Sequence, residues 1–196
     1  MDIWQAGGYS DGSDGMPPAV YTFAAAPGQV LTFSSVTGRW SCGGALISRS
    51  KNGPDGTNKG NCFAGPISFA PVGPFSGFDS TDFVSALVGM FLADSLPSSA
   101  PATLGFYWAN NSLGGIKTNF YSLSPQIGQV FFIGNGLTGR RTGLTQVFNV
   151  PQDATNLYLG YVDDCGNGLP GCYIDNYGSL TATFAVASPM VTILDK

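Results

Sequence analysis

Apolar and polar positions along this chain alternate in the way that extended strands require. The alternation is clearest in two segments, whose apolar positions are Leu157, Leu159 and Tyr161 in the first and Leu180, Ala182 and Phe184 in the second. A period of two residues places such side chains on one face of a strand. Since no segment carries the apolar stripe of an amphipathic helix, the pattern predicts an all-β protein.

The core of this protein is expected around one nearly continuous apolar run at 84–92. A run of this kind predicts a central strand that is buried on both faces. Further core strands are predicted at 106–108 and 131–133.

The first quarter of the chain predicts shorter elements. Residues 3–5 predict an initial strand. The stretches 21–24 and 30–34 flank the turn residues Pro27 and Gly28, which predicts a β-hairpin.

Two segments stand outside this regular pattern. Residues 65–82 are rich in Gly, Pro and Phe and predict a long ordered loop. Its aromatic residues are expected to pack over the end of the core, with a contact surface for another subunit as the alternative; they are Phe69, Phe75 and Phe78, with Phe83 just after. The apolar stretch 190–194, within the segment 187–196, predicts an extra strand or one that reaches into a neighbouring subunit.

Composition adds that the chain is one weakly charged domain. The 196 residues include 28 Gly, 13 Pro and 14 Phe, and we expect a single domain over 1–196, because all-β domains of this size are often undivided. Charged residues make up 10%, against roughly 25% in an average soluble domain. With 8 basic and 12 acidic residues and scattered Lys and Arg, nucleic acid is excluded as a partner. No window approaches the ~20 apolar residues of a membrane span.

The chemistry of the chain is concentrated between its last two predicted strands. Acidic and amide side chains crowd this turn, and no Lys or Arg lies among them; they are Asp163, Asp164, Asn167, Asp175 and Asn176. Hard cations bind six to eight such oxygens, which makes the turn a candidate Ca²⁺ site. The alternative is ordinary turn chemistry, because Asp, Asn and Gly are common turn residues. The stretch that contains Asp11 and Asp14 predicts a flexible turn, with a second cation site as the alternative.

The four cysteines predict disulfides and an oxidising compartment. They allow three pairings. The pairing of Cys165 with Cys172 would close the acceptor-rich turn, and that of Cys42 with Cys62 would close a facing loop. A four-cysteine zinc site is disfavoured because no CxxC pair is present. We therefore expect a secreted or cell-surface protein.

The segment 170–180 (Pro-Gly-Cys-Tyr-Ile-Asp-Asn-Tyr-Gly-Ser-Leu) resembles the calcium loop of bacterial galactose-binding lectins of the LecA type. Weaker similarity covers 26–42, 52–56, 85–92 and 125–134. The resemblance implies an antiparallel β-sandwich of the jelly-roll or lectin-like kind, with long ordered loops. It also implies a set of Ca²⁺ ligands: Asp163 or Asp164, the carbonyl of Cys172, Asp175, Asn176, and the carbonyl of Cys42 or its neighbour.

The sugar site of this family carries over less well. The lectin grips its ligand with a His and a Gln, whereas this chain has no His. Its corresponding loop offers Asp55, Asn58, Lys59 and Asn61 instead. The aromatic candidates for stacking on a sugar ring are Trp40, Tyr173 and Tyr177.

Two functions follow as expectations, and neither is enzymatic. Without His, the Ser-His-Asp and Cys-His arrangements are excluded, and no acid–base pair is recognisable. The first expectation is a calcium-dependent carbohydrate-binding module, outside a bacterial cell. The second is a homo-oligomeric or polymeric subunit of an extracellular filament or surface layer, in which Ca²⁺ has a structural role. Low charge and abundant Phe are compatible with the second.

Overall fold

The structure of this protein is a computed structural model in which nearly every described residue belongs to a strand, a turn or a loop. It describes residues 1–42, 53–56, 67–80, 83, 85–108, 115–139, 142–163 and 168–188. The predicted partners at 164–167, the residues Asn58 and Cys62, and the segment after 188 lie outside this described part.

Strands dominate the described part, with two short 3-10 helices, η1 (Ile3–Gly8) and η2 (Tyr173–Asp175). The strands are β1 (Ala19–Thr22), β2 (Val30–Cys42), β3 (Ile67–Phe69), β4 (Phe78–Ser80), β5 (Leu87–Leu92), β6 (Leu104–Tyr107), β7 (Ile116–Lys117), β8 (Ser122–Leu123), β9 (Val130–Phe132), β10 (Val147–Asn149), β11 (Asn156–Tyr161) and β12 (Asn176–Ala187). The prediction of an all-β fold is confirmed.

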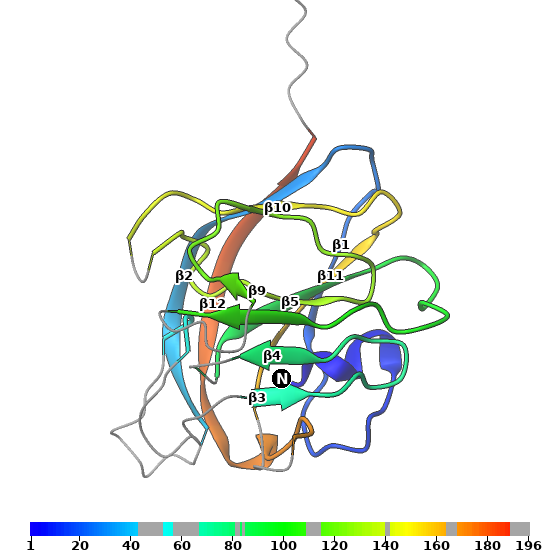
Figure 1. Cartoon of the computed structure of the whole chain (residues 1–196), viewed down its shortest axis with the longest axis vertical. Coiled ribbons are helices and arrows are strands. Elements are labelled where there is room, and N and C mark those ends of the chain that lie inside the picture. Colours follow the sequence, from blue (N-terminus) through cyan, green and yellow to red (C-terminus); the bar gives the residue numbers. More distant parts are fainter. Residues whose placement is uncertain are drawn as a thin grey trace, which may run out of the picture.

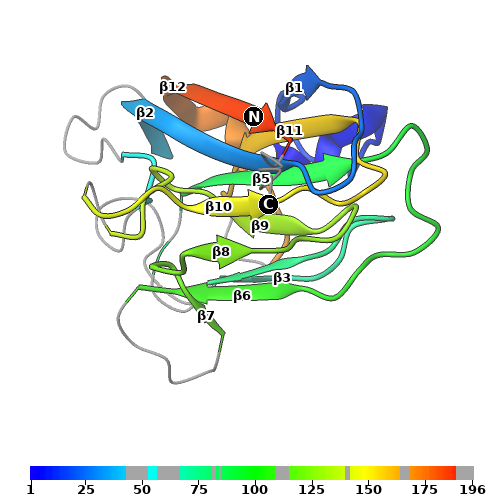
Figure 2. The same ribbon diagram turned by 90° about the horizontal axis from the view of Figure 1, so that it is seen from above.

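These strands form three sheets (Figures 1 and 2). The central sheet has the order β1-β11-β5-β9, the long-strand sheet β12-β2-β10-β8, and the third sheet β3-β4-β6-β7. Neighbours in the central sheet are antiparallel, and β2 pairs antiparallel with both β12 and β10. Parallel pairing joins β10 to β8, β4 to β6 and β6 to β7. The central sheet is therefore antiparallel throughout, the long-strand sheet is antiparallel except at β8, and the third sheet is mainly parallel.

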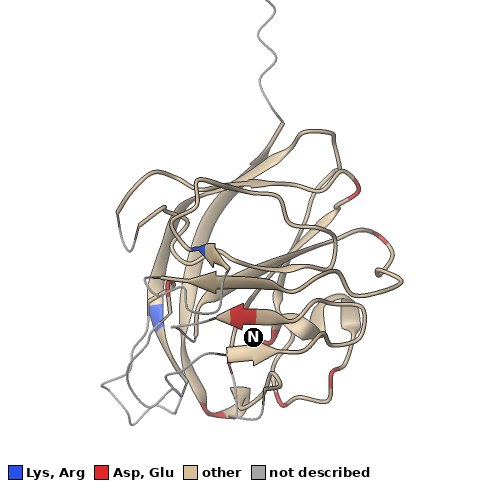
Figure 3. Cartoon of the chain, in the orientation of Figure 1, with Lys and Arg blue, Asp and Glu red and all other residues tan. Residues whose placement is uncertain are grey.

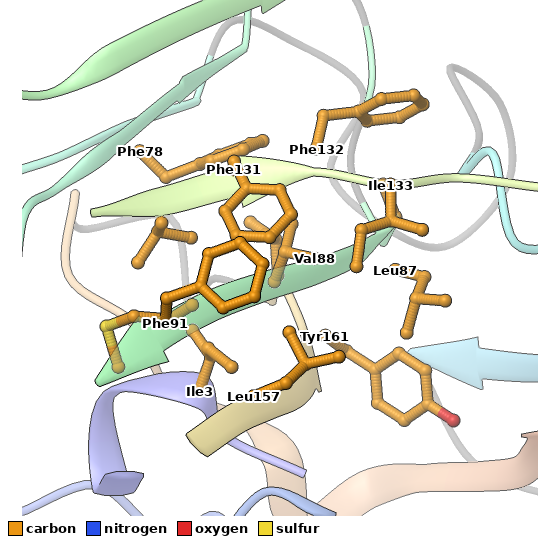
Figure 4. Close-up of a cluster of buried hydrophobic side chains, with 14 of the residues drawn as sticks. Ile3, Phe78, Leu87, Val88, Phe91, Phe131, Phe132, Ile133, Leu157 and Tyr161 are labelled. Atoms are coloured by element: carbon orange, nitrogen blue, oxygen red, sulfur yellow. The ribbon is translucent and has the colours of Figure 1, made fainter. Parts of the chain in front are cut away.

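Strand β9 joins the three sheets through two adjacent phenylalanines (Figure 4). Successive side chains of a strand point to opposite faces. Phe131 contacts Phe148 of the long-strand sheet, with ring centroids 5.3 Å apart. Phe132 points the other way and contacts Phe106 of the third sheet at 5.9 Å. The central sheet is thus covered on both faces.

This double cover explains the apolar run that the sequence shows at 84–92. Every residue of β5 is buried, and Val88, Met90 and Phe91 are fully so. Its flanking strands are β11 on one side and β9 on the other, so β5 lies inside its sheet as predicted.

The predicted strand at 3–5 is wrong, because these residues form η1. The Asp2 side chain accepts a hydrogen bond from the Trp4 backbone N–H at 3.0 Å, which caps the helix. Ile3 and Trp4 are fully buried, and the Trp4 indole donates to the Ser76 carbonyl at 2.9 Å. In a strand, the neighbouring side chains of Ile3 and Trp4 would point to opposite faces. The short helix lets both of them enter the core.

The predicted hairpin between 21–24 and 30–34 is also wrong. Strand β1 pairs with β11 and β2 pairs with β12 and β10, so the chain crosses from one sheet to the other. Buried Gln29 holds the crossing: its side chain accepts from Ala26 N–H at 3.0 Å and donates to the Ala24 carbonyl at 2.9 Å. A local pattern does not reveal which distant strand each segment pairs with.

The predicted loop at 65–82 contains a short antiparallel pair, β3 with β4, so it is more regular than expected. The prediction for its aromatic residues is confirmed: Phe69, Phe75, Phe78 and Phe83 are 0–1% exposed. They pack over the end of the core, for example Phe69 against Trp4 with ring centroids 5.3 Å apart.

The core makes a first prediction. Replacing Phe131 with Ala removes the ring that lies between Phe91 and Phe148. We expect the free energy of unfolding to fall by about 3–5 kcal/mol. Urea denaturation followed by tryptophan fluorescence measures it, with Tyr121→Ala as the control because Tyr121 is 60% exposed. Equal losses in the two variants would contradict the assignment of β9 as the joint.

Candidate functional site

The turn from β11 to β12 is built around a buried tyrosine. Asp163 lies two residues beyond β11, and its backbone carbonyl accepts from the Gly171 N–H at 3.3 Å. Tyr173, in η2, is 6% exposed and its hydroxyl donates to the Tyr161 carbonyl at 3.3 Å. Burial, followed by the charges of Asp2 and Asp163, raises the pKa of Tyr173 well above its ordinary value. Tyr173 is therefore a neutral part of the turn's core.

Strands β2 and β12 hold the other side of this turn in fixed register (Figure 1). Asn176, the first residue of β12, lies opposite Cys42, and Tyr177 lies opposite Ser41. Two residues predicted as calcium ligands thus meet across one ladder. The position of the Cys42 carbonyl follows from pairing, whereas the sequence alone offered it only by resemblance.

The N-terminal acidic loop packs against the same turn. The Asp14 carboxylate accepts a hydrogen bond from the Tyr173 backbone N–H at 3.0 Å. Asp11 accepts from the Ser13 N–H at 2.9 Å, and the Ser13 hydroxyl donates to the Asp2 carboxylate. A side chain at Gly15 would collide with Asp2 and with the Tyr173 ring, so glycine is required there.

Asp2 is the most perturbed acid of this region. It is fully buried, and burial, opposed by the Ser13 hydrogen bond and reinforced by Asp11, raises the pKa of its carboxyl to about 6. Its charged neighbours are the Asp11 carboxylate and the amino group of Met1. An environment that disfavours negative charge in this way is one that a bound cation would relieve.

Several buried polar atoms at this end of the described chain lack a hydrogen-bond partner. They are one carboxylate oxygen of Asp11, both polar atoms of the Asn176 amide, and the Ser41 hydroxyl. Buried polar groups are nearly always satisfied, so such a group indicates a water, an ion or a ligand. Carboxylate, amide and hydroxyl oxygens are the donors that Ca²⁺ prefers, and the residues therefore fit that ion chemically.

The structure brings together four of the predicted calcium residues: Asp163, Cys172, Asp175 and Asn176 lie in one turn. Asp163 is buried and Asp175 is exposed. Among the described residues, no three acidic, Cys or His side chains lie close enough to hold a metal ion by themselves. Amide and carbonyl oxygens are needed in addition, and Asp164 lies outside the described part.

The predicted sugar contacts are dispersed. Asp55 is buried and accepts from the Asn135 backbone N–H at 2.9 Å, which ties down the loop after β9. Trp40 is 1% exposed, stacks on Tyr161 at 4.3 Å, and donates to the Ser85 carbonyl at 3.2 Å. Of the three aromatic candidates Trp40, Tyr173 and Tyr177, Tyr177 is the exposed one, at 60%.

Two clefts border the turn. One, of about 550 Å³, lies between the acidic loop and the turn and is lined by Asp11, Ser13, Asp14, Val72, Pro170 and Cys172, among others. A second, of about 410 Å³, lies across the turn and includes Asp14, Asn176 and Tyr177. Asp14 borders both clefts. Its carboxylate therefore has the polar groups of the first cleft on one side and the aromatic ring of Tyr177 on the other.

Cys172 is disulfide-bonded. The predicted pairing with Cys165 involves a residue outside the described part, and so does the pairing of Cys42 with Cys62. Cys172 also has a positive φ of 59°, an uncommon conformation for a residue with a side chain.

Sequence reasoning missed Asp2 and Ser41 as members of this region. Asp2 precedes the apolar pair Ile3-Trp4 as a helix cap would, but the helix is too short to give a periodic signal. Ser41 is one of many serines in the chain, and only the register with Tyr177 places it beside the turn.

Comparison with models of protein families, with curated proteins and with solved structures finds no match for this chain. The described residues include no helix of the length and apolar character that crossing a bilayer requires.

The buried Asp2 carboxyl predicts a specific dependence of stability on pH. The carboxyl is protonated below about pH 6 in the folded protein but only below about pH 3.8 in the unfolded chain. The folded state thus holds the extra proton between these values, and the free energy of unfolding falls as pH rises through this window. Asp2→Asn keeps the acceptor for Trp4 N–H and removes the titration.

We expect thermal melts in EDTA to show this decline from pH 4 to 6 in the parent protein and a flatter profile in Asp2→Asn. The matched control is Asp153→Asn, because Asp153 lies exposed in a turn. Parallel profiles for the parent protein and Asp2→Asn would show that Asp2 titrates normally.

Proposed function

We propose that this protein is an extracellular, calcium-dependent carbohydrate-binding module. The observation that carries the proposal is the convergence of two acidic segments on one end of the sandwich, where buried oxygen atoms lack partners. Asp14 joins the segments directly through the Tyr173 backbone N–H. The resemblance to LecA-type lectins supports the same chemistry at the same turn.

The turn residues would hold the ion. Side chains of Asp163, Asp164, Asp175 and Asn176, with the carbonyls of Cys172 and Cys42, form the proposed ligand set. The ion would supply positive charge beside Asp2, whose pKa is raised by burial and by the neighbouring Asp11. The protein's own contribution is rigidity: the β2–β12 register and the Cys172 disulfide hold the oxygen atoms in place.

The sugar would lie in the 550 Å³ cleft between the acidic loop and the turn. Neutral sugars present hydroxyl donors, and the Asp11 and Asp14 carboxylates are acceptors placed at this cleft. The exposed ring of Tyr177 lines the adjoining 410 Å³ cleft on the other side of Asp14, where it would offer an apolar face to a further sugar unit of a longer glycan. A protein with 10% charged residues suits a neutral ligand of this kind.

Calcium binding gives the first test of this proposal. We expect millimolar Ca²⁺ to raise the melting temperature relative to EDTA; at a hundredfold excess over Kd the stabilisation is about 2.7 kcal/mol. Asn176→Ala removes a ligand and should abolish most of the shift. Asn119→Ala is the control, because Asn119 is exposed near β7. Identical melts of the parent protein in Ca²⁺ and EDTA would refute the calcium site.

Sugar binding gives the second test. Asp11→Asn keeps the acceptor for Ser13 N–H but removes the charge that faces the cleft. We expect affinity for galactose-type sugars, measured by calorimetry in Ca²⁺, to fall at least about tenfold, since hydrogen bonds to charged groups contribute about 1.5–3 kcal/mol. Asp153→Asn should bind normally. A parent protein that binds Ca²⁺ but none of a panel of neutral glycans would refute the carbohydrate function alone.

A further inference from the structure

Strand β12 is a long edge strand without the usual protection against further pairing. It lies at the end of the order β12-β2-β10-β8, so within the described residues one of its two edges faces β2 and the other faces no strand. Edge strands normally carry charges, prolines or bulges that discourage added strands. β12 contains no charged residue and no proline over its twelve residues (Figure 3). Its ladder with β2 has one register shift, at Thr183/Phe184, and the extra residue there is Ser34 of β2, so β12 itself is not bulged.

The open edge of β12 is already used for one hydrogen bond. The Leu180 backbone N–H donates to the Tyr161 hydroxyl at 3.1 Å, on the side away from β2. In an antiparallel ladder, residues alternate in the direction of their backbone groups. The N–H and C=O of Ala182 therefore face the same open edge as those of Leu180, where another strand would bond to them.

An apolar groove runs beside this edge. It has a volume of about 220 Å³ and lies between β12 and the central sheet. It is lined by apolar side chains from both sheets, and no charged side chain is among them; they include Ala19, Leu87, Leu159, Leu180, Ala182 and Phe184. The groove shares no residue with the acidic 550 Å³ cleft.

Exposed apolar side chains surround the groove. Val20 and Tyr21 of β1 are 56% and 47% exposed, and Met1, at the groove itself, is 44% exposed. Tyr21 contacts Phe184 across the two sheets, with ring centroids 5.2 Å apart. An open edge, an apolar groove and an apolar rim together form a site for one extended, apolar peptide segment.

The sequence that follows β12 has this character. Residues 190–194 are Met-Val-Thr-Ile-Leu, which combine β-branched and apolar side chains, and they lie outside the described part. Five extended residues span about 17 Å, the same length as residues 180–184 that border the groove. Val191 and Ile193 would point together to one face of such a strand.

A return of this segment onto its own β12 is disfavoured by the turn it would need. Strand β12 ends at Ala187, which leaves Ser188 and Pro189 as the loop. Two-residue hairpin loops adopt type I′ or type II′ turns. Both types need a positive φ at the first loop residue, which is usually glycine in type II′, and type I′ needs a positive φ at the second residue as well. Proline fixes φ near −65°, and a longer loop would consume the apolar run itself.

We propose that residues 190–194 of a second copy of this chain add a strand to the open edge of β12 and place Val191 and Ile193 in the apolar groove. This inference goes beyond the proposed carbohydrate function and does not depend on it. The contact is heterologous, because the donor segment and the acceptor groove are different surfaces. Repetition therefore produces a ring or an open filament.

Two variants of the full chain test the two surfaces separately. Ile193→Asp disables the donor segment outside the described fold, and Ala182→Asp puts a charge into the groove. Leu144→Asp is the control, because Leu144 is 67% exposed and lies outside the groove. Analytical ultracentrifugation at about 100 µM reports the mass, and circular dichroism confirms that each variant is folded.

We expect the parent protein and Leu144→Asp to form multimers and each groove or donor variant to be monomeric. A mixture of Ile193→Asp and Ala182→Asp should form a 1:1 heterodimer, because one supplies an intact groove and the other an intact donor. If Ala182→Asp fails to fold, Ile193→Asp alone must still abolish assembly. A monomeric parent protein, or multimers of Ile193→Asp, would overturn the proposal; the result is independent of added glycan and EDTA.

Discussion

Burial of the central sheet on both faces is the constraint on which the rest of this structure depends. Adjacent residues of β9 send one phenylalanine to each side, so the long-strand sheet and the third sheet are fixed relative to the same strand. The inner strand β5 and its neighbour β9 then have no solvent-exposed face, and the acidic residues of the central sheet lie at strand ends. The acidic turn lies at such an end, where β11 leaves the central sheet and β12 enters the long-strand sheet.

That position gives the turn an unusual electrostatic environment. The sandwich closes over Asp2 completely, and the carboxyl finds a hydroxyl and a backbone N–H as hydrogen-bond donors. Burial disfavours its charge, and the neighbouring Asp11 disfavours it further. Such carboxyls reduce stability unless another interaction offsets the effect. The unpartnered amide of Asn176 lies at the same end of the fold, and the cation that we propose there would offset both effects.

The sequence predicted where several of the main strands lie, but it did not predict which strands pair with one another. Alternation and apolar runs identified β5, β11 and β12, because burial of side chains imposes a local period. The pairing of β1 with β11 and of β2 with β12 depends on residues more than a hundred positions apart. The proline–glycine turn at 27–28 suggested a local hairpin, whereas buried Gln29 shapes a crossing between sheets. Asp163, Asp175 and Asn176 were identified by composition and the Cys172 carbonyl by resemblance, but Asp2 and Ser41 belong to the region only through tertiary packing.

Strand β12 links the two proposals in space without making one depend on the other. Its first residue belongs to the acidic turn, and its later residues border the apolar groove. Tyr161 contacts both: its carbonyl accepts from Tyr173, and its hydroxyl accepts from the Leu180 N–H at the open edge. Burial raises the pKa of the Tyr161 hydroxyl, so it remains a neutral partner for that N–H. Tyr161 therefore fixes the acidic turn and the open edge of β12 to the same residue of β11.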